Sequence, residues 1–128
     1  MSETGEYLNI QHSKQHKFIK GEVKSIDFQN DGHHIVYIPS LKLSAYGPSL
    51  RDAIKMMTDI VIPDFCETLM SQPIATVLAE LKSYGWGQHK FFPKQLSKTA
   101  HVDVEGILRD FDLPKETKIN ESVYTVAA

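Results

Sequence analysis

Cysteine is almost missing from this chain, because Cys66 is the only one among 128 residues. A single cysteine excludes an intrachain disulfide and a cysteine-based metal cluster, and we expect Cys66 to be a small buried side chain on a helix. Long apolar runs are missing too, since segments such as Ile60-Val61-Ile62 are far too short to cross a bilayer. The polar N-terminal stretch lacks the apolar core of a signal peptide. We therefore expect a cytoplasmic protein that makes no membrane contact.

A strong charge of either sign is also lacking, because the formal net charge is −2. Bulk electrostatic attraction to nucleic acid or to an anionic membrane is therefore not expected. The hydrophobic fraction of 41% and the length of 128 residues are typical of one globular domain with a core of its own.

The motifs of common enzyme classes are absent from the sequence, which has no Gly-rich phosphate loop, histidine–glutamate metalloprotease helix or G-x-S-x-G elbow. No cofactor or metal is therefore expected. A metal-dependent nuclease remains as an alternative, and it would need several carboxylates converging on magnesium. Four aspartates lie near the predicted sheet and first helix: Asp27, Asp31, Asp52 and Asp59. Asp27 and Asp31 lie at the hairpin end, Asp52 caps the first helix, and Asp59 falls outside the apolar stripe of that helix. These carboxylates do not converge on one point, so we expect no catalytic site.

What is present is organised around residues 31–57. Asp31-Gly32 predicts a tight hairpin turn, because both central residues of such a turn need positive φ. A strand over 33–38 follows, and alternation over 41–46 predicts the next one. Ser49 lies three residues before Asp52, which indicates a capped helix start.

These motifs, in this order, resemble the HicB-like domain of bacterial toxin–antitoxin systems, over about residues 18–86. The residues that carry the resemblance are Gly32, Tyr37, Pro39, Leu41, Tyr46, Gly47, Ser49, Asp52 and Ala53. The resemblance implies a noncatalytic relative of the ribonuclease H fold, with a three-stranded meander followed by a long helix. It also implies a protein that neutralises a small basic ribonuclease toxin by occlusion. The tail after Trp86 matches neither the ribbon-helix-helix nor the helix-turn-helix extension of many members, so DNA binding is not implied.

Two helices should cover the meander. The first starts at Ser49, and its apolar stripe recurs at helical spacing through Ala53, Ile54, Met57, Val61, Phe65 and Leu69. Pro63 predicts a kink or break within it. The second begins at Pro73 and ends at Gly85, the expected left-handed stop.

Three outer segments complete the chain. Residues 1–17 are expected to form a flexible arm or a short edge strand, in which His12 and His16 lack a third metal ligand. The strand over 18–28 moves its apolar residues from one face to the other near Lys24, which suggests a bulge or a change of environment. Residues 87–128 should pack on the same domain, with a short helix near 102–111 and a strand over 119–126 that joins the meander or another subunit.

Basic and aromatic residues interleave between residues 82 and 98, the pattern of a single-stranded nucleic acid contact. The candidate residues are Lys82, Trp86, Lys90, Phe91, Lys94 and Lys98. The structural alternative is that the aromatic rings fix this segment onto the core.

Taken together, the sequence predicts an α+β protein with a three-stranded antiparallel meander, a long kinked helix, a second helix and a C-terminal helix and strand extension. The first functional hypothesis is a noncatalytic HicB-like antitoxin whose partner is a small basic toxin, and we expect a homo-oligomer. An RNA-binding module using residues 82–98 is the alternative, and a metal-dependent nuclease comes third.

Overall fold

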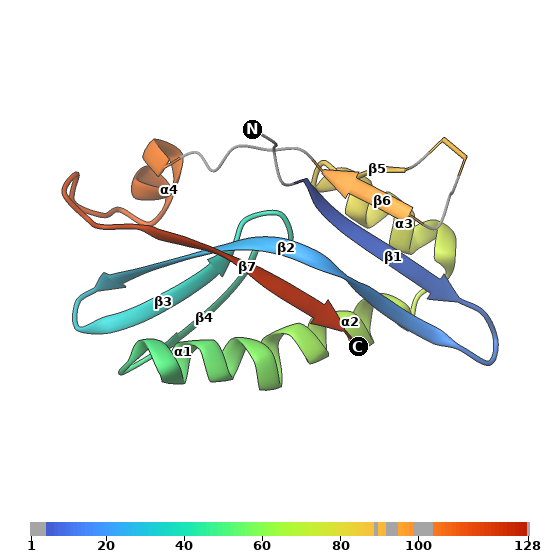
Figure 1. Ribbon diagram of the computed structural model, residues 1–128, viewed down its shortest axis with the longest axis horizontal. Coiled ribbons are helices and arrows are strands. Elements are labelled where there is room, and N and C mark those ends of the chain that lie inside the picture. Colours follow the sequence, from blue (N-terminus) through green and yellow to red (C-terminus); the bar gives the residue numbers. More distant parts are fainter. Residues whose placement is uncertain (1–4, 89, 92–94, 99–103, 128) are drawn as a thin grey trace.

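The structure is a computed structural model that describes residues 5–88, 90–91, 95–98 and 104–127. It confirms the α+β class, with an antiparallel sheet backed by a long helix (Figure 1). The strands are β1 Glu6–His12, β2 Lys17–Asn30, β3 His33–Ile38, β4 Leu43–Gly47, β5 Gly87–Gln88, β6 Gln95–Lys98 and β7 Asn120–Ala127. The helices are α1 Leu50–Met56, the π-helical turn η1 Met57–Val61, α2 Ile62–Met70, α3 Ile74–Ser83 and α4 Val104–Asp110.

The long strand β2 organises the sheet. Its residues 17–22 pair with β1 and its residues 26–30 pair with β3, while residues 20–27 pair with β7. Because a strand has only two edges, β1 and β3 must share one edge of β2, one after the other, and β7 must occupy the opposite edge. The predicted C-terminal strand therefore joins the meander of β2, β3 and β4, and β6 extends the sheet beyond β1.

The Asp31-Gly32 turn between β2 and β3 is confirmed. Both residues have positive φ, at 52° and 78° respectively, as a two-residue hairpin turn requires. The Ser49 cap is confirmed as well, because its side chain accepts the backbone N–H of Asp52 at 3.1 Å. These two local signals fix where β3 and α1 begin.

The two faces of the sheet carry different clusters. The face that we call inner lies against the helices, and its buried residues include Leu8, Ile10, Ile19, Val23, Val36, Ile38, Ala45 and Val126, packed with Ala53, Met57, Ile62, Cys66, Leu69, Val77 and Leu81. The outer face buries only a small cluster near α4, made of Ile26, Phe28 and Ile107 among the described residues. The pairing of β2 with β7 runs without interruption past Lys24, so the apolar crossover predicted there is a change of environment.

The first helix is irregular where the sequence predicts it. The N–H of Ile62 bonds to the carbonyl of Met57, five residues back, and this π-helical turn directly precedes Pro63. The extra residue rotates the buried face, so Ile62 and Cys66 are buried after the turn, whereas Val61 and Phe65 of the predicted stripe are only half-buried. The predicted stripe assumed one uninterrupted α-helical period and is therefore displaced by one residue after the turn. It is also wrong for Ile54, which precedes the turn and is 42% exposed. Burial raises the pKa of the Cys66 thiol to about 11, as fits a packed side chain.

The end of α3 places Trp86 in the core. Gly85 has φ +99°, and the backbone N–H groups of Gly85 and Trp86 bond to the carbonyls of Lys82 and Leu81. This pair of bonds is a Schellman motif, which turns the chain sharply and allows Trp86 to pack on the inner face. The predicted stop at Gly85 is confirmed, and Trp86 is only 2% exposed.

The expectation of a flexible N-terminal arm is wrong for residues 6–12. They form β1, which pairs with β2 on one side and with β6 on the other. Leu8 and Ile10 are fully buried on the inner face. The alternation that makes this a strand is short and surrounded by polar residues, so its burial depends on partners far along the chain.

Among the described helices, none combines the length and apolar character that a membrane-spanning segment requires.

Candidate binding surface

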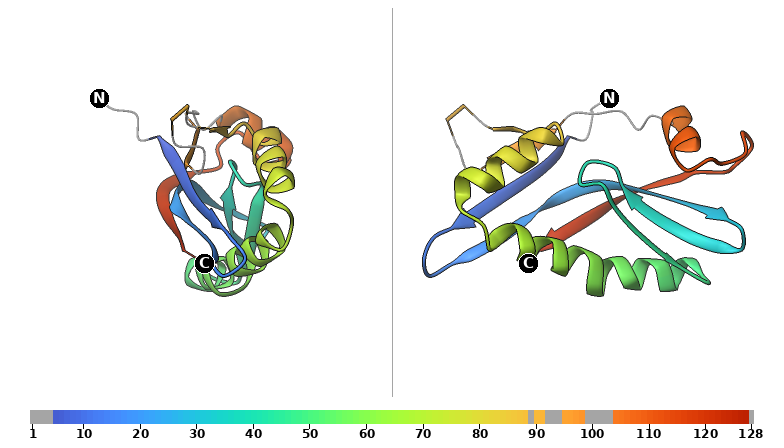
Figure 2. Two further views of the ribbon diagram at one scale, coloured as in Figure 1. Left: turned by 90° about the vertical axis from the view of Figure 1, so that its right-hand side faces the viewer. Right: turned by 180° about the vertical axis from the view of Figure 1, so that it is seen from behind.

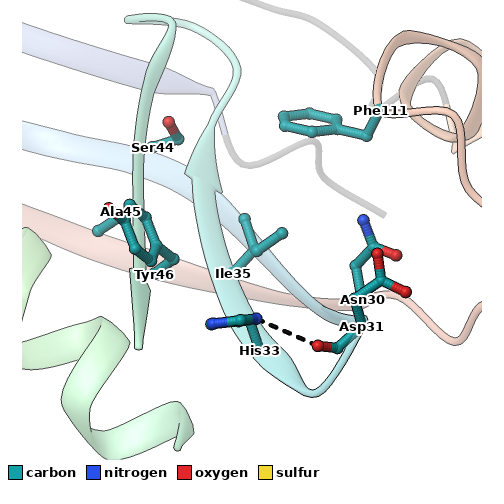
Figure 3. Close-up of a pocket in the computed structure, with 8 residues that line it drawn as sticks. All are labelled: Asn30, Asp31, His33, Ile35, Ser44, Ala45, Tyr46 and Phe111. Atoms are coloured by element: carbon teal, nitrogen blue, oxygen red, sulfur yellow. Dashed lines mark hydrogen bonds between the residues drawn. The ribbon is translucent and has the colours of Figure 1, made fainter. Parts of the chain in front are cut away.

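An open hollow lies on the outer face of the β3–β4 hairpin, beside the turn that joins β2 to β3 (Figure 3). Its volume is about 450 Å³, and it is lined by Asn30, Asp31, His33, Ile35, Ser44, Ala45, Tyr46 and Phe111. Ile35 and Tyr46 lie directly opposite one another in the ladder and so share a face. The volume lies within the range of small-ligand pockets, and it would also accept one or two side chains of a protein partner.

Aromatic rings form the walls of the hollow. Phe111 follows α4 and packs edge-on against Phe28 and Tyr37, with ring centroids 5.2 and 5.1 Å apart. On the other side, Tyr46 meets His33 edge-on at 6.4 Å. Figure 3 shows Ile35 between Tyr46 and Phe111, so the floor is apolar. Tyr46 is 62% exposed, which leaves a large ring open to solvent on this surface.

The charge near the hollow is negative. Asp31 lines it, and its backbone carbonyl accepts a hydrogen bond from His33 Nδ1 at 3.2 Å. Burial, and secondarily the carboxylate of Asp110 at the end of α4, raise the pKa of Tyr37. No lysine or arginine is among the described residues that line this hollow. A cationic group placed here would therefore meet the Asp31 carboxylate without repulsion from a lysine or arginine of the described lining.

The acidic side chains of the described residues do not form a metal-binding cluster. In the part of the chain that the structure describes, no group of three or more histidine, cysteine or acidic side chains could hold a metal ion. Asp27 accepts a hydrogen bond from Asn120 at 3.1 Å, Asp52 lies in the capped first turn of α1, and Asp59 belongs to the π-helical turn. The four aspartates weighed for a nuclease thus lie in separate places.

The two histidine pairs also lack the geometry of a metal site. His12 ends β1 and its Nε2 donates to the carbonyl of Gln72 at 2.7 Å, while His16 lies in the turn that follows. His33 is exposed and His34 is half-buried on consecutive positions of β3. Neither pair shares a face that would chelate one ion.

The basic and aromatic segment 82–98 is only partly available to a ligand. Trp86 is buried and its indole donates to the carbonyl of Ser40 at 3.0 Å, so it cannot stack on a base, and that part of the prediction is wrong. The Lys98 ammonium donates to the carbonyl of Tyr84 at 2.5 Å. Lys82 is exposed, as are Lys90 and the Phe91 ring, which lie 5.7 Å apart from ammonium to ring centroid. Lys94 lies outside the described residues.

One polar network was not foreseen from the sequence. Glu6 is 5% exposed, and its carboxylate accepts the Lys24 backbone N–H at 2.9 Å and the Ser40 hydroxyl at 2.6 Å. It lies where the shared edge of β2 passes from β1 to β3, so it satisfies a backbone donor that neither strand reaches. The Trp86 bond to the Ser40 carbonyl extends the same network. Nothing near Glu6 in sequence signals this role.

The residues of the family motif have structural positions around the hairpin. Gly47 approaches α1 so closely that an added Cβ would lie 2.8 Å from Cβ of Asp52, and Leu41 and Ala53 are buried. Tyr46 is the exception, because it faces solvent. The fold and the hollow together describe an α+β domain that carries an apolar surface hollow with Asp31 at its rim. Comparisons with family models, curated proteins and solved structures found no match.

Proposed function

We propose that this protein is a noncatalytic binding domain of the HicB-like antitoxin type, which occupies a small basic ribonuclease toxin through the outer face of the β3–β4 hairpin. The observation that carries the proposal is the hollow between Tyr46 and Phe111, with its apolar floor and acidic rim. The order of elements, a three-stranded meander followed by a long helix, agrees with the resemblance that suggested this class of partner.

Tyr46 supplies the anchor of the proposed interface. Large aromatic side chains that become desolvated in a complex account for much of the binding energy of protein interfaces. Tyr46 is 62% exposed here, and across the hollow Phe111 is packed against Phe28 and Tyr37. A partner side chain that enters the hollow therefore meets a preformed wall and covers an exposed ring.

Charge favours a basic partner over an acidic one. Asp31 lines the hollow, and Asp110 acts on Tyr37 beside it. Complementary charge at such a rim accelerates association and selects against acidic proteins. In this proposal inhibition follows from occlusion of the toxin, without a catalytic step by this domain.

The proposal predicts that a neighbouring open reading frame encodes a short basic protein, and the test uses that protein, purified, as the probe. Calorimetric titration should detect binding, and Tyr46→Ala should weaken it by about 10-fold or more, as expected for a central aromatic anchor. Phe18→Ala is the matched control, because Phe18 is also an exposed aromatic, 39% exposed, at the far end of the outer face.

Ribonuclease activity of the probe should fall as this protein is added and should recover with Tyr46→Ala. Absence of binding, or equal loss of affinity in the two variants, would refute the proposal. Salt-sensitive binding of single-stranded RNA by this protein alone, without binding of the probe, would favour the RNA-binding alternative instead.

A further inference from the structure

The strand β7 presents the longest open edge among the described strands. It has β2 as its neighbour, and its eight residues read Asn-Glu-Ser-Val-Tyr-Thr-Val-Ala. In the left view of Figure 2, β7 lies at the margin of the molecule, away from β4 and α3. An open edge of this length offers a row of backbone donors and acceptors to any further strand.

This edge lacks the features that normally prevent pairing. Natural edge strands are short, or carry lysine, proline or bulges. The edge strand β4 has five residues and lies between Lys42 and Pro48, and β5 has only two residues. In β7, by contrast, Glu121 is the single charged residue, and proline is absent from the strand.

Exposed apolar side chains accompany the open edge. Val123 is 57% exposed on the outer face of β7. On the inner face, the Tyr124 hydroxyl donates to the carbonyl of Ile54 at 3.4 Å and also bonds to the Thr58 hydroxyl. Ile54 itself is 42% exposed. Backbone hydrogen-bonding groups and solvent-exposed apolar area therefore occur together where β7 meets the first helix.

We propose that β7 pairs antiparallel with β7 of a second copy of this chain about a two-fold axis perpendicular to the sheet. In the register that centres on Val123, each Val123 meets its counterpart and Glu121 faces Thr125 of the other copy. No like charges then lie opposite one another, and two exposed valines are covered. Such an isologous contact closes after two subunits and joins the two sheets into one.

The substitution Val123→Glu tests the dimer contact without disturbing the fold of one subunit. In one subunit, Val123 lies directly opposite Lys24 of β2, so Val123→Glu creates an opposite-charge pair there. Across the two-fold axis, the same substitution would place two carboxylates face to face. Gln11→Glu on β1 is the matched control, since Gln11 is exposed in a strand but remote from β7.

Sedimentation equilibrium of the full chain should give twice the 14.5 kDa mass for the unmodified protein and for Gln11→Glu. Val123→Glu should give 14.5 kDa with an unchanged circular dichroism spectrum, and its dissociation constant should rise by about 100-fold or more. Hydrogen exchange should show amides of 120–127 becoming protected as protein concentration rises.

Three results would overturn this assignment: a monomer up to roughly 1 mM, a Val123→Glu variant that remains dimeric, or concentration-dependent protection located at β4. The hollow on the β3–β4 hairpin is not altered by Val123→Glu, so binding of the basic probe should persist. Failure of the dimer and failure of the proposed function are thereby distinguishable.

Discussion

The inner face of the sheet is covered from one end to the other, by α1, η1, α2, α3 and the Trp86 ring. Among the described residues, the outer face is covered only where α4 and Phe111 lie against Ile26 and Phe28, and beside them the hollow remains open. Burial on the inner face accounts for stability, because apolar area removed from water is the main favourable term in folding. The uncovered outer face contributes little to folding, and its exposed aromatic ring is the one on which the proposed function depends.

The largest expected difference between the faces comes from truncating one aromatic residue on each. Trp86→Ala should lower the free energy of unfolding by about 3–5 kcal/mol, because it opens a cavity and leaves the Ser40 carbonyl without its indole donor. Phe111→Ala should cost less than about 2 kcal/mol, since Phe111 is only half-buried. Urea denaturation of both variants measures this, and equal losses would show that the outer cluster is as important for folding as the inner one.

A smaller contrast comes from two glutamates on neighbouring strands. Glu6→Ala should destabilise the protein by about 2–3 kcal/mol, because the Lys24 N–H and the Ser40 hydroxyl lose their buried acceptor. Glu22 is exposed on the outer face of β2, and Glu22→Ala should change stability by no more than about 0.5 kcal/mol. Glu6→Gln keeps an acceptor oxygen and should fall between them. Thermal unfolding of the three variants would expose any reversal of this order.

The smallest effect concerns alkaline pH. Burial, and secondarily the carboxylate of Asp59, raise the pKa of Tyr124 above its ordinary value of 10.0. The unfolded chain therefore loses this proton first, so the stabilisation is complete below pH 10 and disappears as pH rises through the raised pKa. Tyr124→Phe should make the unfolding free energy fall less steeply above that pH. Denaturant titrations at pH 8 and above 10 provide the measurement, and identical pH profiles would contradict it.

Local signals in the sequence predicted much of the framework. Asp31-Gly32, Ser49 and Gly85 each act on their own few neighbours through φ or a capping bond, and each was confirmed. A strand near the N-terminus was expected only as an alternative and only at an edge, because the burial of β1 depends on β2 and on β6, which lies more than 80 residues later in the sequence. Glu6 was missed for the same reason.

The hollow could not be predicted from the sequence, although one of its lining residues, Tyr46, is among those that carry the HicB-like resemblance. It requires Phe111 to meet the β3–β4 hairpin, and that contact joins residues more than 60 positions apart. For Trp86 the structural alternative holds, and the nucleic-acid interpretation was open because a tryptophan among lysines gives the same sequence pattern whether its ring faces solvent or core. The Schellman turn at Gly85 decides between them by turning the chain inward.

The π-helical turn at Met57–Val61 makes the long helix two half-helices with different angular phase. Ile60, Val61 and Ile62 are all apolar, so an apolar side chain faces the core here in either register. The chain could therefore gain or lose one residue at this point while both halves kept their contacts. Related chains whose lengths differ by a single residue in this helix should therefore differ between positions 57 and 61. A one-residue deletion elsewhere in the helix would turn Ala53 or Cys66 toward water.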